Sequence, residues 1–268
     1  MILSRYDGRL MVIAQPDHGV QTGLIAQSWG NEEIPFRTDR PEATLLAARH
    51  HDDGWAVWER RPTLDTETQQ PIQFLNVRAR EHLAAYRAGI TRAAQIDPWA
   101  GLLVSMHGVG LYNDRYGTYR LEELGEQHLT SEEQTLVDHF IHDMAELQND
   151  LFAQATGRRP AEPPDGNHNV RADYLALQTW DRLSLQFAFR HAVDGVIAPL
   201  GHEGGRLVCM NRGRFTLALD PFPFAEDRVE LPVSARLVAD RTYRTPEEFI
   251  TALSDAAPTT IECVVHRI

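Results

Sequence analysis

HNVRADYLALQTWDRLSLQFAFR, residues 168–190, is the stretch on which the expected fold depends. It is long enough for about six turns of helix. Apolar side chains recur along it at helical spacing, which is typical of a buried central helix; they are Tyr174, Leu177, Trp180, Leu185 and Phe189. Asp181 lies among them, and a buried carboxylate requires a partner. The sequence therefore predicts a central helix that carries a paired carboxylate.

The chain before this helix has helical patterns, and the chain after Leu200 alternates as strands do. We expect helices over residues 15–30, 41–54, 75–95, 99–111 and 131–156. The first fourteen residues predict two short strands joined by a turn at Asp7-Gly8. After Leu200, we expect an antiparallel sheet with one short helix over residues 246–256. Whether the N-terminal hairpin joins that sheet stays open.

The fold class that these patterns predict is mainly α. Residues 1–200 are expected to form a helical-bundle domain that includes the N-terminal β-hairpin. Residues 201–268 are expected to form a small antiparallel β lobe packed on it. A chain of 268 residues, 43% hydrophobic, can bury a substantial core.

Several classes of protein do not fit the composition. No apolar run approaches the ~18 residues of a membrane span, the N-terminus lacks a signal-peptide pattern, and two cysteines cannot form a disulfide framework. We expect a soluble, cytoplasmic protein. A net charge of −12 argues against a nucleic-acid partner, and a chain without lysine has no Schiff-base or phosphate-loop lysine.

Histidines and aspartates on separate predicted helices are the candidates for chemistry. They are His18, His51 with Asp52 and Asp53 in HHDDGW, His107 in SMHGVG, and Asp181. Imidazole and carboxylate together suit divalent Mn, Fe, Co, Ni or Zn. Trp55 and Trp58 favour a partly closed site around HHDDGW, although a solvated or ion-paired helix end is the simpler alternative. The sequence thus predicts that a shared cation pairs these side chains.

At this point the order His18, His51-Asp52, Asp181 resembles the H…HD…D signature of the HD domain, a superfamily of helical metal-dependent phosphohydrolases with some di-iron oxygenases. HDDG resembles the HD-x-G that often follows the doublet, and DRLSL resembles the surroundings of the last aspartate. The resemblance covers residues 15–190. More closely, QPDHGVQTGLIAQSWG with HDDGWAVWE resembles an uncharacterised family of unknown function, a divergent HD-like branch.

The resemblance implies roles for individual residues. His18, His51, Asp52 and Asp181 would bind one metal ion, and His107 a second one. Asp53 would bridge the metal ions, orient a histidine, or be an ordinary helix-end residue.

Three further histidine positions have weaker support. His50 would replace His51 if the register were off by one, and His82 has the surroundings of a helix-surface histidine. His142-Asp143 is a second HD pair, on an exposed acidic helix.

Arginines near these ligands would hold an anionic substrate, because a guanidinium matches phosphate and carboxylate. Arg49 and Arg182 are the candidates, with Arg171 also near in sequence. Trp55 stands where many phosphohydrolases have a lysine or arginine after HDxG. The glycine-rich turn 201–207, with His202 and Glu203, would either line the site or lead into the β lobe.

The predicted function is a metal-dependent hydrolase of a small phosphorylated or nucleotide-like substrate. One or two ions would activate water, with Asp53 or His107 accepting its proton. Two alternatives stay open. One is a binuclear-iron oxygenase, if His107 and Asp53 complete the site; the other is a non-catalytic metal- or ligand-binding module whose β lobe mediates association. Homo-oligomerisation is undecided.

Overall fold

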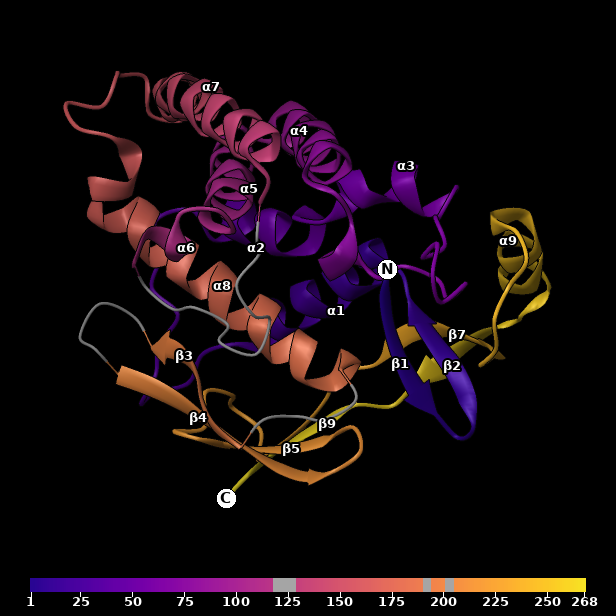
Figure 1. Cartoon of the computed structure of the whole chain (residues 1–268). Coiled ribbons are helices and arrows are strands. Elements are labelled where there is room, and N and C mark those ends of the chain that lie inside the picture. Colours follow the sequence, from indigo (N-terminus) through magenta and orange to yellow (C-terminus); the bar gives the residue numbers. More distant parts are fainter. Residues whose placement is uncertain (118–128, 190–193, 201–204) are drawn as a thin grey trace.

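The computed structural model describes residues 1–117, 129–189, 194–200 and 205–268 (Figure 1). Helices make up 52% and strands 20% of it, with the strands in two sheets of four and five. The protein is therefore a mixed α/β protein. The prediction of a mainly α fold with a small β lobe is wrong, because strands far apart in the sequence pair into two separate sheets.

The helices agree closely with the sequence patterns. They are α1 (Gln15–Ser28), α2 (Pro41–His50), α3 (Ala56–Glu59), α4 (Ala79–Ile96), α5 (Pro98–Gly110), α6 (Asp114–Gly117), α7 (Ser131–Thr156), α8 (His168–Ala188) and α9 (Pro246–Asp255), with short 3-10 turns η1 (Asp53–Trp55), η2 (Phe74–Asn76) and η4 (Pro164–Gly166). Thr130 and Glu133 form a capping box that starts α7, and left-handed Gly157 ends it. Among the described residues, no helix is long and apolar enough to cross a membrane.

The first sheet joins the two ends of the chain. Its strand order is β1 (Ile2–Tyr6), β2 (Arg9–Ile13), β7 (Val233–Ala239) and β8 (Pro258–Ile261), and every pairing is antiparallel. The predicted N-terminal hairpin is confirmed, and it pairs with C-terminal strands.

The second sheet is formed by the C-terminal part of the chain alone. Its order is β3 (Gly195–Leu200), β4 (Gly205–Gly213), β5 (Thr216–Asp220), β9 (Val264–Arg267) and β6 (Arg228–Glu230). The β5–β9 pairing is parallel, which corrects the expectation of a purely antiparallel sheet.

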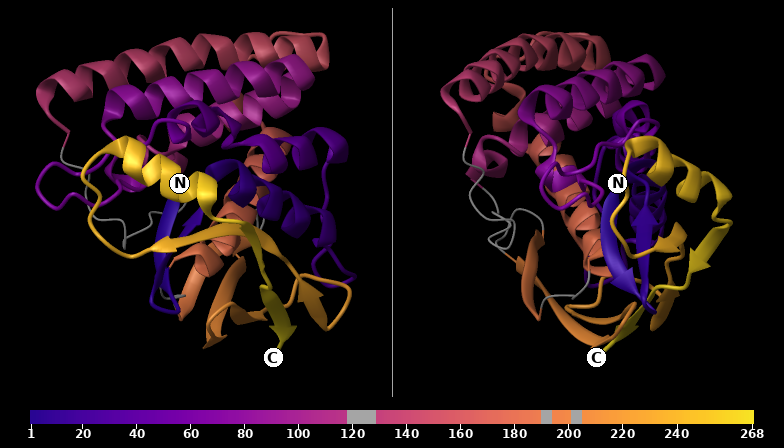
Figure 2. Two further views of the ribbon diagram at one scale, coloured as in Figure 1. Left: turned by 90° about the vertical axis from the view of Figure 1, so that its right-hand side faces the viewer. Right: turned by 45° about the vertical axis from the view of Figure 1, so that its right-hand side comes forward.

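Helix α8 lies between the helical layer and the five-stranded sheet. Figures 1 and 2 show α4, α5 and α7 on one side of it and the sheet on the other. The four-stranded sheet has an apolar layer on each face: Met11 and Ile13 join the main core, whereas Leu10 and Val12 pack with Phe249 of α9. This alternation is what a strand covered on both faces requires.

The main core is continuous across the predicted boundary at residue 200. Trp180 and Leu183 of α8 belong to the same buried cluster as Leu207, Cys209 and Val265 of the five-stranded sheet. The five-stranded sheet therefore packs against α8 and helps to position this helix, which carries Asp181.

At two glycines, the backbones of neighbouring elements come unusually close to each other. A Cβ on Gly19 would lie 2.7 Å from Arg49 O, so only glycine lets α1 pack this closely on α2. A Cβ on Gly54 would lie 1.9 Å from Ala85 O and 2.6 Å from Gly89 N. The glycine of HHDDGW therefore allows η1 to lie against the backbone of α4.

We expect Gly54→Ala to destabilise the protein by several kcal/mol, because the added methyl group overlaps a carbonyl that cannot move without shifting α4. Thermal unfolding followed by circular dichroism measures the effect. Gly166→Ala is the matched control, since its Cβ would meet nothing closer than 3.4 Å. An equal melting temperature for both variants would show that the α4 contact is not required.

Candidate metal centre

Five buried side chains from four parts of the chain meet in the helical half. One comes from α1, two follow the end of α2, one comes from α5 and one from α8; they are His18, His51, Asp52, His107 and Asp181. None is more than 4% exposed. They form two overlapping groups that could hold a metal ion, His18-His51-Asp181 and His51-Asp52-His107. All five metal ligands predicted from the sequence are therefore brought together.

The nitrogen and oxygen atoms of the cluster are close to one another. His18 Nε2 lies 3.0 Å from Asp181 Oδ1 and 4.0 Å from Asp52 Oδ2. His51 Nε2 lies 3.4 Å from Asp52 Oδ2 and 3.8 Å from Asp181 Oδ1. His107 Nε2 lies 3.9 Å from Asp52 Oδ1. Two donors bound at about 2.1 Å from one ion are about 3–4 Å apart, so these separations fit a shared cation.

A hydrogen-bond chain fixes the tautomer of His18. Gln21 Nε2 donates to Leu231 O at 2.6 Å, so Gln21 Oε1 is free to accept from Ser184 Oγ at 2.7 Å. The single Ser184 hydroxyl proton is used there, and Ser184 Oγ must accept from His18 Nδ1 at 2.7 Å. With Nδ1 engaged by Ser184, Nε2 is the ring nitrogen that faces Asp181 Oδ1, 3.0 Å away.

The backbone orients the His51 ring so that its Nε2, like that of His18, faces the carboxylates. Its Nδ1 donates to Ala48 O at 2.9 Å, which leaves a lone pair on Nε2 when the ring is neutral. Among the described residues, Nε2 is buried without a hydrogen-bond partner. A bare nitrogen that faces carboxylate oxygens is unfavourable unless a proton or a cation lies between them.

The charges of the cluster are strongly coupled. Burial alone would lower the pKa of His51, but Asp52 and Asp181 outweigh it and raise that pKa to about 9. Burial opposes ionisation of Asp181, yet the hydrogen bond with His18 and the neighbouring His51 ring hold its pKa well below the usual value. Burial and the charge of His51 lower the pKa of His107 well below 6.5. Without a metal ion, a proton on His51 offsets one of the two carboxylate charges, and Arg115 Nη1 lies 3.6 Å from Asp181 Oδ2.

Tyr86 of α4 holds the remaining oxygen of Asp52. Its hydroxyl donates to Asp52 Oδ1 at 3.1 Å, and its ring lies beside His107, with centroids 5.7 Å apart. Burial, with the charge of Asp52, raises the Tyr86 pKa well above 10, so the phenol stays protonated and remains a donor. Asp52 is thereby fixed with one oxygen toward Tyr86 and the other toward His18 and His51.

The structure does not bring every predicted residue into this cluster. Asp53 is partly exposed and accepts from His50 Nδ1 at 2.9 Å, outside both groups that could hold an ion. Arg182 is buried and donates to Ile197 O at 3.0 Å, which ties α8 to β3. Arg49 is exposed and Arg171 is partly exposed.

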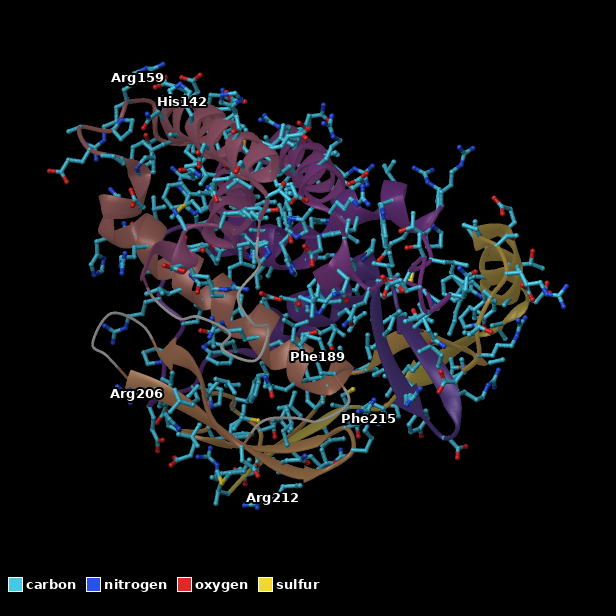
Figure 3. All side chains as sticks on the ribbon, in the orientation of Figure 1. His142, Arg159, Phe189, Arg206, Arg212 and Phe215 are labelled. Carbon is cyan, nitrogen blue, oxygen red and sulfur yellow. The ribbon has the colours of Figure 1, made fainter. Side chains whose placement is uncertain are left out.

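Three minor expectations have mixed outcomes. His82 is buried, 7% exposed, and shares a hydrogen bond of 2.6 Å with the Tyr112 hydroxyl, so it is not a surface histidine. His142 and Asp143 are exposed on α7 as predicted, and Figure 3 labels His142 at the outer side of that helix. His202 and Glu203 lie outside the described residues.

Sequence reasoning missed four residues of this site: Ser184, Gln21, Tyr86 and Arg115. Ser184 follows Asp181 by three positions and Gln21 follows His18 by three, so both lie on the same helix face as the residue they support. That spacing is a usable signal. Tyr86 and Arg115 carry no local signal, because only the packing of α4 and α6 brings them to the cluster.

The fold and the cluster together describe the kind of protein this is. It is a mixed α/β protein with buried His and Asp groups that could hold a metal ion. A family model described as "Protein of unknown function (DUF3891)" matches residues 1–240. The chain belongs to this family, and the matched range contains all five residues of the cluster. No curated protein and no solved structure matched the chain.

The neutral, buried His82 predicts how stability depends on pH. Burial lowers its pKa from 6.5 to about 4, so below pH 6.5 the unfolded chain binds a proton that the folded chain rejects. The free energy of unfolding therefore has its highest value above pH 6.5, as far as His82 is concerned. It decreases by about 2–3 kcal/mol as the pH drops to about 4. His82→Gln should remove this part of the acid sensitivity in urea unfolding at pH 7 and 4.5.

The exposed His139→Gln is the control for this measurement and should keep the wild-type acid sensitivity. If His82→Gln loses as much stability between the two pH values as the wild type does, the buried histidine is not the cause.

Proposed function

We propose that the cluster binds one divalent transition-metal ion. The observation that carries this proposal is that His18 and His51, each held at Nδ1 by a hydrogen bond, both turn Nε2 toward the carboxylates of Asp52 and Asp181, and that His51 Nε2 has no hydrogen-bond partner among the described residues. A cation satisfies both nitrogens and both carboxylates at once. Because His51 Nε2 belongs to both three-residue groups and can bind only one ion, one ion is favoured over two.

The donor set also bears on the identity of the ion. Three imidazoles and two carboxylates are borderline ligands that suit Mn, Fe, Co, Ni or Zn. Five protein donors exceed the four of a structural zinc site. We therefore favour an ion that accepts six ligands, for which one position is left to a water or a substrate.

The reaction that we propose is hydrolysis of a small phosphorylated or nucleotide-like substrate, in accord with the resemblance of H…HD…D to the HD domain. The bound ion would lower the pKa of water so that hydroxide is available near neutral pH. His107 suits the role of a ligand better than that of a proton acceptor. Burial lowers its pKa well below 6.5, so the neutral ring can bind the ion through Nε2 and keep its proton on Nδ1.

An oxygenase is the second candidate, for one specific reason. Each of the two groups, His18-His51-Asp181 and His51-Asp52-His107, consists of two histidines and one carboxylate. This is the donor set of many iron(II) oxygenases. Asp52 and His107 beside the first group fill positions that oxygen and a substrate would need, and so we place hydrolysis first.

The proposed function predicts about one equivalent of metal per chain. Protein purified without chelator, or reloaded with Mn, Fe, Co, Ni or Zn, is measured by elemental mass spectrometry and assayed for phosphate release from small phosphate monoesters. The His51→Ala, Asp52→Ala double variant should lose both the metal and the activity, because it removes two donors.

The matched control is His142→Ala, Asp143→Ala, which alters the exposed HD pair on α7 and should keep both. Two equivalents of metal would contradict a single ion, and no metal after reloading would refute the proposal. Bound metal without phosphate release, but with oxygen consumption by the iron form, would favour the oxygenase. Metal with neither activity would leave a structural site.

The hydrogen-bond chain behind His18 predicts an effect on metal affinity without loss of a ligand. Ser184→Ala removes the acceptor of His18 Nδ1 and frees the ring to rotate, so affinity should fall about 10–100-fold. Competition with a chromophoric chelator measures it. Ser105→Ala is the control, since Ser105 is equally buried but accepts from Gln148 instead of a histidine. Equal affinities for both variants would show that Ser184 does not orient the ligand.

A further inference from the structure

A row of aromatic side chains connects the cluster to the surface of the helical half. Tyr86 begins it, because its hydroxyl lies 3.1 Å from Asp52 Oδ1. The ring of His82, four positions before Tyr86 on α4, follows with its centroid 4.9 Å from that of Tyr86. Tyr112, just after α5, lies 5.5 Å from His82 between ring centroids and is half-buried. Figure 1 shows α4 and α5, which carry or adjoin these residues, side by side.

The outer end of this row is a phenol in direct contact with an imidazole. The Tyr112 hydroxyl and His82 Nδ1 are 2.6 Å apart, at the short end for a hydrogen bond. Burial lowers the pKa of His82 to about 4, so its ring is neutral near pH 7 and has one free lone pair. Burial also raises the pKa of Tyr112, so its phenol keeps its proton. A protonated phenol and a neutral base therefore share one hydrogen bond.

This pairing makes Tyr112 easy to oxidise. A phenol that loses one electron becomes a radical cation, which is a very strong acid. When the lone pair of His82 is on Nδ1, the imidazole takes up that proton over the existing hydrogen bond. The phenol then becomes a neutral radical, and no positive charge remains on a half-buried ring. Electron and proton leave Tyr112 together, in different directions.

The inner end of the row is less suited to hold a radical. The Tyr86 hydroxyl faces the carboxylate of Asp52, so its proton would pass to a group whose negative charge the bound ion requires. His82 is not among the residues of the cluster, and its protonation leaves those ligands unchanged. An oxidised Tyr86 would therefore regain its electron from Tyr112.

Close ring packing provides the route for that electron. Electron tunnelling weakens steeply with the gap between groups, and rings with centroids about 5–6 Å apart are in edge contact. Trp55 packs beside the row, 5.1 Å from His82 and 6.0 Å from Tyr86 between centroids, and is 1% exposed. The passage from Tyr112 to the cluster is thus filled with aromatic side chains.

We propose that Tyr112 with His82 is a redox site that donates one electron to iron bound in the cluster when hydrogen peroxide reacts there. The inference rests on the proposed metal site. Hydrogen peroxide accepts two electrons, its O–O bond breaks, and two hydroxide ions leave. One electron comes from iron(II), which becomes iron(III). The other comes from Tyr112, whose phenolic proton passes to His82 Nδ1, so atoms and charges balance. The oxidising equivalent ends on a half-buried side chain outside the metal ligands.

The test observes the radical directly. Full-length protein loaded with iron(II) and freed of excess iron is mixed with equimolar hydrogen peroxide, frozen, and examined by electron paramagnetic resonance. We expect a tyrosyl signal that narrows in protein produced with ring-deuterated tyrosine. Tyr112→Phe should lose the signal and keep the iron. His82→Gln keeps the phenol but removes the base, so it should lower the radical yield severalfold.

Two controls separate this site from other tyrosines and from free iron. Tyr243→Phe makes the same chemical change at a buried phenol that donates to Ala239 O, so it should keep the signal. The His51→Ala, Asp52→Ala double variant, which should hold no iron, should give no signal. A second measurement needs no variant at Tyr112: a stable nitroxide couples to the radical in the wild type, and peptide mass spectrometry should find the adduct on Tyr112.

The outcomes distinguish this inference from the metal proposal. Wild-type protein that binds no metal ends both. Protein that binds other ions but not iron, or whose iron form gives no radical, overturns only the redox site. A signal that persists in Tyr112→Phe does the same, as does an adduct on Trp55 or Tyr86 in place of Tyr112.

Discussion

Two buried carboxylates that share one small volume are the constraint on which the helical half depends. Asp52 and Asp181 both approach His18 Nε2 and His51 Nε2, and like charges at such a distance in a dry interior repel strongly. Only a positive charge between them makes the arrangement favourable. A proton on His51 supplies it in one state, and a divalent cation in the state that we propose. The packing of α1, α2 and α8 therefore has an electrostatic requirement as well as an apolar one.

The sheets take part in this constraint, although no strand contributes to the cluster itself. Gln21 holds Ser184 toward His18 only while its amide donates to Leu231 O, in the segment between β6 and β7. Arg182 fastens the helix of Asp181 to β3 through Ile197 O. The β structure is thus a support on which the orientation of two cluster residues depends, and this explains physically why a small appended lobe was the wrong description.

The sequence could predict features that depend on neighbouring residues, but few that depend on contacts between distant parts of the chain. Helix α7 was predictable to the residue, because its capping box and its closing glycine lie next to its ends in the chain. The five cluster residues were predictable from their types and order. The pairing of β2 with β7 could not be predicted, since it joins residues 9–12 to residues 236–239. Neither strand has a sequence feature that identifies the other as its partner. Arg115 was missed for the same reason, because its contact with Asp181 exists only in the folded chain.

The net charge of −12 and an anionic substrate are compatible because the two act over different distances. Exposed charges are screened within about 8–10 Å by salt, so the acidic surface, such as the outer face of α7, governs encounters with large polyanions. A buried site responds mainly to the charges within it, since little water lies between them. There the balance depends on Asp52, Asp181 and their neighbours together with the ion that we propose. An acidic surface is therefore compatible with a small anionic substrate at the proposed site.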